Sequence, residues 1–262
     1  MSLPLRGAVD ASQCREHELL RRALVVVHFS PVLKIVDKTG AGIADFQDAV
    51  RGIYPQLDSE TEQSLNVELV PDKGVQATIQ ENLVWNLRDA DGVWTITLTS
   101  QSIGLGVAGD AYTSREDFSD RVRYLIAAVQ EHFVPGQVTR IGVRYVNAEA
   151  VDGNNDPRKF CTRELVSISG ETSVAEADLM WRFPVDEGTL LLRSGIVGQG
   201  RSYDPAMMPP APQRCWYLDI DVFSEPKDPF LIDPICEAVD RQLLRIYEIY
   251  RWAIPHPIGQ AT

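Results

Sequence analysis

Asp219 and Asp221 are the residues of this chain whose types and spacing could do chemistry. They alternate along the apolar stretch from Trp216 to Phe223, which has the pattern of a β-strand, so both carboxylates lie on one face. Two carboxylates on one strand face can hold a divalent cation, or they can serve as an acid and a base. The pair therefore raises the hypothesis of a metal-dependent hydrolase acting on a phosphoester-type substrate.

Arg140 and Arg144 share one face of a second predicted strand and offer another explanation for the two carboxylates. As anion binders they would complete a hydrolase site. As cross-strand partners they would instead neutralise Asp219 and Asp221 on a solvated or partly covered sheet face. We favour the ion pairs, because a sheet with one buried face commonly carries polar side chains on the other. The four residues form a candidate binding or ion-pair cluster, and the sequence assigns no catalytic residue.

Gly104, Gly106 and Gly109 match the G-x-G-x-x-G pattern of dinucleotide-binding sites and follow a predicted strand. Such a site needs a helix that begins inside the motif, so that the helix N-terminus meets the pyrophosphate. The next helix is predicted to start only at Thr113, so we interpret the glycines as part of a strand or its end. H-E-x-x-H, G-x-S-x-G and Walker motifs are absent from the sequence. We predict no cofactor and no metal site, and the balance leans against an enzyme.

A long amphipathic helix is predicted immediately before the arginine-bearing strand. Thr113 and Glu116 form a T-x-x-E pattern, in which each side chain can satisfy a backbone N–H of the other residue's turn. Apolar residues then recur at helical spacing, at positions 118, 122, 125, 126, 129 and 133. Pro135 and Gly136 mark the end of this helix. Residues 140–147 alternate strictly and predict a strand with two distinct faces.

The remaining pattern predicts an α+β protein with antiparallel β-sheets, each packed by a long amphipathic helix. Further strands are predicted at residues 23–29, 65–70, 75–87, 94–99, 175–185, 189–197 and 215–223. A second long helix is predicted to begin at Asp233-Pro234, with the aspartate as its N-cap. Runs of strands followed by a helix favour this class over a doubly wound α/β fold.

A run of strands followed by a long helix occurs twice, around residues 65–133 and 172–253. This order suggests two similar halves, an N-terminal one at residues 1–151 and a C-terminal one at residues 152–262, within one or two domains. Gly198–Gln213 holds four prolines and is predicted to be a long loop or flap. A groove between the halves, roofed by this flap, would be the natural place for a ligand or partner.

The overall charge argues against some classes of partner. The chain of 262 residues carries 25 basic and 37 acidic side chains, a net charge of −12, which opposes binding to nucleic acid and to anionic membranes. A targeting signal and a run of membrane-spanning length are not found, so we expect a cytoplasmic protein. The four cysteines include no C-x-x-C pair, and Cys215 and Cys236 suit buried thiols.

Four stretches resemble a bacterial protein family of about this length that is distributed sporadically among genomes and has no established activity. The stretches are Leu24–Val32, Tyr112–Phe118, Thr139–Asn147 and Leu218–Asp221, and the most specific is the string R-I-G-V-R-Y-V-N. The resemblance covers nearly the whole chain, with one departure at His28, where a basic residue is expected. It implies no reaction, cofactor or catalytic residue. A sporadic distribution suggests a link to mobile or defence-associated genes.

These observations lead to an expectation about function. We expect a non-catalytic binding or regulatory module that acts with a protein partner encoded nearby, or as a homodimer. The metal-dependent hydrolase is the first alternative, and it requires Arg140, Arg144, Asp219 and Asp221 to converge in a concave pocket. Nucleic-acid binding through the arginine face is the second alternative, and the net charge of −12 weighs against it.

Overall fold

The structure is a computed structural model, and it describes residues 3–7, 19–70, 74–152, 156–166 and 173–255. Its centre is one ten-stranded antiparallel sheet with the strand order β2-β3-β4-β5-β1-β6-β9-β8-β7, to which the short β10 adds beside β6. The strands are β1 (Leu20–Phe29), β2 (Gln56–Val70), β3 (Gly74–Arg88), β4 (Trp94–Thr99), β5 (Ser102–Ala108), β6 (Gln137–Ala150), β7 (Ala177–Val185), β8 (Gly188–Val197), β9 (Cys215–Ser224) and β10 (Asp228–Pro229).

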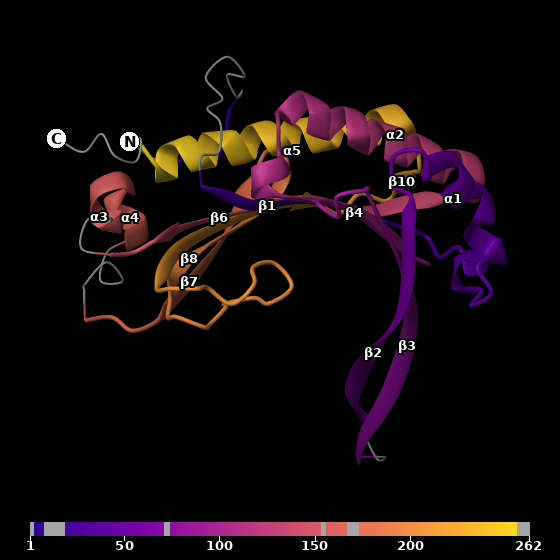
Figure 1. Cartoon of the computed structure of the whole chain (residues 1–262), viewed down its shortest axis with the longest axis horizontal. Coiled ribbons are helices and arrows are strands. Elements are labelled where there is room, and N and C mark those ends of the chain that lie inside the picture. Colours follow the sequence, from indigo (N-terminus) through magenta and orange to yellow (C-terminus); the bar gives the residue numbers. More distant parts are fainter. Residues whose placement is uncertain (1–2, 8–18, 71–73, 153–155, 167–172, 256–262) are drawn as a thin grey trace.

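Two long helices, α2 (Arg115–Phe133) and α5 (Ile232–Ala253), lie on the same face of this sheet (Figure 1). The main core lies between the helices and the sheet, because alternate strand residues such as Val25, Val143 and Ile220 are buried there together with the apolar stripes of both helices. The α+β class with antiparallel strands is thus confirmed. The expectation of separate sheets, each with its own helix, is replaced by one sheet.

The seam between β1 and β6 lies at the middle of the sheet. β1 and β6 pair along most of their lengths, with Val25 opposite Val143, and β6 also pairs with β9. The order of elements is similar on either side of this seam. Along the chain, β1 is followed by the strands β2, β3, β4 and β5 before α2, and β6 is followed by β7, β8, β9 and the short β10 before α5. The division near residue 151 stays a prediction, and β6 ends next to it.

Shorter helices cover the rim of the sheet. They are α1 (Ala44–Val50), α3 (Pro157–Phe160) and α4 (Arg163–Val166), with the 3-10 helices η2 (Leu33–Val36), η3 (Ala41–Ile43) and η4 (Gly109–Ala111). The glycine motif lies in β5 and η4, as expected for strand glycines.

Two helix starts differ from the sequence prediction. The N-cap of α2 is Ser114, not Thr113, because Ser114 has an extended backbone and its Oγ accepts a hydrogen bond from the backbone N–H of Asp117 at 3.1 Å. The N-cap of α5 is Leu231, and Asp233 lies within the first turn, where its charge favours the helix dipole without capping an N–H. Polar residues beside a helix start therefore locate it only to within a residue or two.

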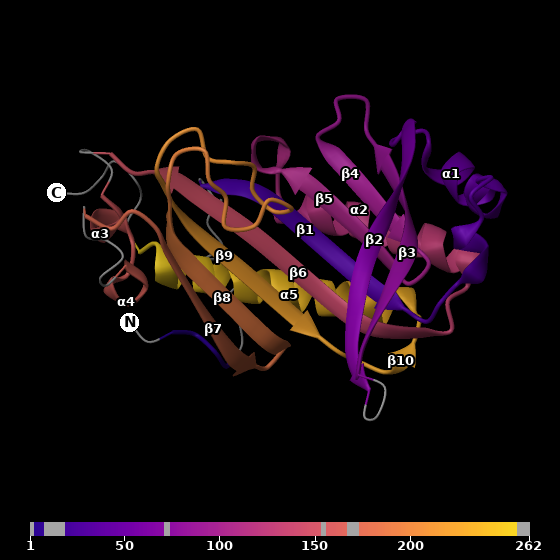
Figure 2. The same ribbon diagram turned by 90° about the horizontal axis from the view of Figure 1, so that it is seen from below.

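The opposite face of the sheet carries two projections, and we call it the flap face. One projection is the flap, residues 198–213, and the other is the hairpin of β2 and β3, which we call the arm (Figure 1). A view from below looks onto the flap face, with the flap over β6 and β9 and the arm in front of the other end of the sheet (Figure 2). The base of the arm is fixed by Trp85, which is buried and donates from Nε1 to the carbonyl of Ile35 at 2.9 Å.

Candidate functional site

The four charged residues expected to cluster do lie together on the flap face. Alternation along β6 and β9 places Arg140, Arg144, Asp219 and Asp221 on the side opposite the helices. Arg144 faces Asp221 in the strand register, yet its guanidinium reaches diagonally to Asp219. Arg144 Nε lies 2.9 Å from Asp219 Oδ1, and Arg144 Nη2 lies 2.6 Å from Asp219 Oδ2. This geometry is that of a bidentate ion pair.

Two residues of the flap complete this ion pair. The hydroxyl of Tyr203 donates to Asp219 Oδ2 at 3.0 Å, and Asp204 Oδ2 accepts from Arg144 Nη2 at 2.9 Å. Asp219 is only 3% exposed, so its charge depends on these partners instead of on water. Arg144 and Asp219 on the sheet therefore form one network with Tyr203 and Asp204 on the flap. This network holds the flap against β6 and β9.

An aromatic stack reinforces the same attachment. The rings of Tyr203 and Tyr217 are stacked, with centroids 4.0 Å apart and planes inclined by 2°. The Arg193 guanidinium lies over the Tyr203 ring, 4.7 Å from its centroid. Arg193 also pairs with Asp178, which accepts a hydrogen bond from the Tyr217 hydroxyl at 2.7 Å. Tyr203 is thus held from both sides, and the flap has a fixed position above the sheet.

The second predicted pair is looser. Arg140 Nη2 lies 3.5 Å from Asp221 Oδ2, and the Arg140 guanidinium also stacks over the Phe223 ring. Burial raises the pKa of Asp221 to about 6, although the nearby Arg140 and Arg144 act in the opposite direction. Burial likewise lowers the pKa of His28, and the charge of Arg140 lowers it further. Burial therefore shifts the protonation of both Asp221 and His28 toward the neutral form.

The arrangement limits what the two aspartates can do. Both oxygens of Asp219 accept hydrogen bonds from Arg144, so a cation could bind there only by displacing that guanidinium. Within the described part of the chain, no three His, Cys, Asp or Glu side chains come together in a way that could hold a metal ion. The Arg144–Asp219 ion pair therefore serves to position the flap.

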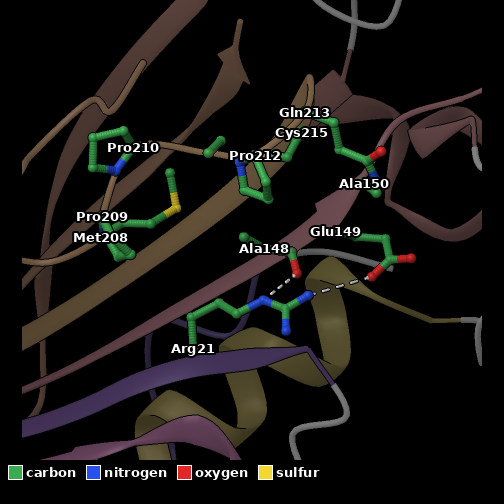
Figure 3. A pocket seen from close by; sticks show the side chains of 11 residues that line it. Arg21, Ala148, Glu149, Ala150, Met208, Pro209, Pro210, Pro212, Gln213 and Cys215 are labelled. Atoms are coloured by element: carbon green, nitrogen blue, oxygen red, sulfur yellow. Dashed lines mark hydrogen bonds and ion pairs between the residues drawn. The ribbon is translucent and has the colours of Figure 1, made fainter. Parts of the chain in front are cut away.

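A cavity of about 370 Å³ lies where the flap meets the ends of β6 and β9 (Figure 3). Its walls come from the flap, from β6 and β9, and from Arg21 of β1. The lining residues are Arg21, Ala148, Glu149, Ala150, Met208, Pro209, Pro210, Ala211, Pro212, Gln213 and Cys215. The volume is in the range of small-ligand sites in proteins. A flap-roofed groove was expected from the sequence, and this cavity lies at the strand ends near the β1–β6 seam.

The polar wall of the cavity is built by two residues. Arg21 Nε donates to the carbonyl of Ala148 at 3.1 Å, and Arg21 Nη2 lies 3.9 Å from Glu149 Oε2. Burial raises the pKa of the Glu149 carboxyl, while Arg21 lowers it and Asp152 raises it. The opposite wall is the proline-rich part of the flap, which is apolar. The cavity therefore combines an apolar slot with one cation and one carboxylate.

Sequence reasoning missed the residues of the flap and the rim that complete this site. Tyr203 and Asp204 stand in a loop without periodicity, so no pattern connects them with Arg144 or Asp219. Arg21 lies at the start of β1, next to Arg22, and looks like an ordinary exposed basic residue. The one usable signal was the density of prolines in residues 198–213, which indicated a long loop or flap.

A comparison of the chain with protein-family models and with curated proteins found no match. The resemblance to the sporadically distributed bacterial family accordingly stays a prediction. Among the described residues, no helix combines the length and the apolar character needed to cross a membrane.

Proposed function

We propose that this chain is a non-catalytic binding module that works in the cytoplasm with a protein partner, and that the flap is its binding surface. The observation that carries the proposal is the network of Arg144, Asp219, Tyr203 and Asp204. The charged residues with the best spacing for chemistry are engaged in fixing a loop. A loop fixed in this way presents a preformed surface, and preformed surfaces bind without an added ordering cost.

The cavity beside the flap gives this surface a place to anchor a partner. Interfaces gain most of their affinity from a few side chains that fill well-packed pockets. A partner encoded nearby in the genome is the first expectation, because of the resemblance to a sporadically distributed family, and defence-associated genes are the corresponding setting. A second copy of this chain is the other candidate partner.

The test is to co-express the chain with the products of its neighbouring genes and to measure complex formation by size-exclusion chromatography with light scattering. The double variant Tyr203→Ala/Asp204→Ala should release the flap and weaken the complex by about tenfold or more, equivalent to about 1.4 kcal/mol. Asp48→Ala is the matched control, because Asp48 is an exposed acid on α1 that pairs with Arg51. Circular dichroism verifies that both variants stay folded.

Three kinds of result would contradict the proposed binding function. A monomer that binds none of these products, or a complex that survives release of the flap unchanged, would count against the proposal. Hydrolysis of bis(p-nitrophenyl) phosphate in the presence of Mg²⁺ or Mn²⁺, lost in Asp219→Asn and in Asp221→Asn, would favour the metal-dependent hydrolase. Retention of DNA or RNA that falls with rising salt and is lost in Arg140→Ala would favour nucleic-acid binding.

We also propose that the two halves arose by duplication. The support is the order of elements, in which a first strand is followed by a run of antiparallel strands and a long helix, with the last long strand of the run pairing beside the first. β5 lies beside β1, and β9 lies beside β6 in the same way. Superposition of residues 20–133 on residues 137–253 tests this proposal. Helices that cross the strands at unrelated angles would contradict it.

A further inference from the structure

The lining of the flap cavity has a chemical character that points to one kind of occupant. Pro209, Pro210 and Pro212 supply flat apolar rings, and Met208 supplies a thioether. Thioether sulfur and proline rings both pack well against aromatic faces. Arg21 adds a guanidinium whose position is fixed by the Ala148 carbonyl, and guanidinium groups stack on aromatic rings. Each of these groups favours a flat aromatic ring over an aliphatic chain.

Glu149 distinguishes among aromatic rings. Its carboxylate lies at the cavity wall and is only 18% exposed, and a carboxylate can accept several hydrogen bonds at once. An indole N–H or a phenol O–H entering the slot would donate to this partly buried acceptor. A phenyl ring has no such donor. The wall therefore favours tryptophan or tyrosine over phenylalanine.

The outer surface of the flap indicates that the ring belongs to a protein. Met208 and Ala211 are buried, while Pro209, Pro210, Pro212 and Gln213 are exposed. The exposed Pro209, Pro210 and Pro212 leave one side of this segment open to solvent. Among the described residues, none donates a hydrogen bond to the carbonyls of the three prolines. These carbonyls can accept hydrogen bonds from the backbone or side chains of a partner.

We propose that the flap cavity binds the side chain of a tryptophan or tyrosine from the protein partner, with the ring between the flap prolines and Arg21 and its N–H or O–H directed to Glu149. This inference rests on the proposed binding function and adds the chemistry of the partner's anchor. The anchor is an aromatic residue exposed on the partner's surface, and it acts as a hot spot of the interface.

The experiment uses the full chain labelled with ¹³C at its methionine methyl groups. The chain has four methionines, of which Met208 lines the cavity and Met180 is exposed on β7. Titration with N-acetyl-L-tryptophanamide should shift the Met208 methyl signal upfield through the ring current and leave Met180 in place. Arg21→Met should weaken this binding by about fivefold. Arg51→Met, at the C-cap of α1, is the matched control and should change nothing.

The hydrogen bond to Glu149 has its own test. The 1-methylindole analogue of the same amide lacks the N–H donor and should bind the wild-type chain about fivefold more weakly. The two probes should bind Glu149→Ala equally, because the acceptor is gone. Free L-tryptophan should bind no more tightly than the amide. If it binds tenfold more tightly, the ligand is a free amino acid and the partner's side chain is excluded.

The outcomes separate this inference from the proposed function. If the Met208 signal does not move with either probe, the aromatic anchor is wrong, even where the chain still forms a flap-dependent complex with a neighbouring gene product. If the Met208 signal moves and Arg21→Met weakens the binding while Arg51→Met does not, the pocket chemistry stands, and the identity of the partner is then decided by co-expression.

Discussion

The flap and the arm project from the same face of one sheet, yet they are held in different ways. The flap has no regular secondary structure, and it is fixed at Tyr203 and Asp204 by their partners on β6, β8 and β9. The arm has a complete ladder of hydrogen bonds between β2 and β3, but its side chains from Leu57 to Gln63 are exposed. Its fixation is concentrated at the base, around Trp85.

This difference shows that regular structure and fixed position are separate properties. A two-stranded ribbon is only marginally stable without a third strand or a hydrophobic face. A loop can be the better-positioned element when buried charges and stacked rings hold it. The binding surface that we propose lies on the loop for this reason. Four substitutions test the comparison, and they are taken here from the largest expected effect to the smallest.

Trp85→Ala should have the largest effect, because it removes the largest of the buried side chains at the base of the arm. Trp85 is 6% exposed, and its truncation leaves a cavity and an unpaired Ile35 carbonyl, so we expect a loss of about 4 kcal/mol in the free energy of unfolding. Urea denaturation followed by circular dichroism measures it. Glu62→Ala, in the exposed part of β2, is the control and should stay within about 0.5 kcal/mol of wild type. Equal effects at the two positions would mean that the arm is held along its length.

Asp219→Ala should have the second-largest effect, because it removes one partner of the buried ion pair that holds the flap in place. The Arg144 guanidinium would keep only Asp204, and we expect a loss of about 3 kcal/mol in the free energy of unfolding. Limited proteolysis should then cut within residues 198–213 earlier than in the wild type. The double variant Arg144→Met/Asp219→Leu removes both charges and should recover much of the stability. A double variant no better than Asp219→Ala would contradict the role assigned to the pair.

Asp221 lies beside the Arg144–Asp219 ion pair, and its contribution to the free energy of unfolding depends on pH. Its pKa in the folded protein is about 6, above the ordinary value of 3.8, so the folded state binds the proton more tightly than the unfolded state. This contribution to stability is complete below pH 3.8 and is lost as pH rises through about 6. The two-unit difference corresponds to at most about 3 kcal/mol, and screening of the partly exposed pair brings it to about 2 kcal/mol.

The measurement is the difference in unfolding free energy between wild type and Asp221→Asn at pH 4 and at pH 7.5. The difference removes the contributions of other groups, such as Asp178, whose pKa is lowered by Arg193 and which acts in the opposite direction. The wild type should lose more stability than the variant over this range. Parallel pH profiles would show that Asp221 is not protonated in this window.

Tyr203→Phe should have the smallest effect of the four. The ring stack on Tyr217 is kept, and only the hydrogen bond from the hydroxyl to Asp219 is lost, so we expect about 1.5 kcal/mol. Thermal unfolding of the variant beside Tyr203→Ala separates the hydroxyl from the ring. If the two variants are equally destabilised, the ring contributes nothing and the flap is held by charge alone.

Periodicity was sufficient for much of the fold and insufficient for the site. The stripe of α2 and the alternation of β4, β6 and β9 predicted those elements closely, since burial on one face imposes a regular spacing. The arm strand β2 begins at Gln56, well before the predicted residue 65, because its exposed residues carry no such spacing. Which strand pairs with which is set by contacts distant in sequence. One sheet in place of two followed from the pairing of β1 with β6, which no local pattern indicates.

The candidate site shows the same limit at the level of single residues. The faces of Arg144 and Asp219 followed from alternation, whereas their diagonal pairing depends on the register between β6 and β9. Asp204 and Tyr203 lie in a segment where neighbouring residues share no face, so their direction is fixed only by the folded loop. The sequence could therefore predict which strand residues share a face with the site, but not which loop residues complete it.

The position of β1 between β5 and β6 has a consequence for synthesis of the chain. β1 is rich in Val and Leu, and β6 ends only at Ala150, so one edge of β1 has no partner until that residue has left the ribosome. During this interval an apolar strand edge is available to other nascent chains, which is a known route to aggregation. A fragment that stops after α2 should accordingly precipitate or recruit a chaperone. In the full-length chain, β6 pairs with β1 as soon as β6 has left the ribosome.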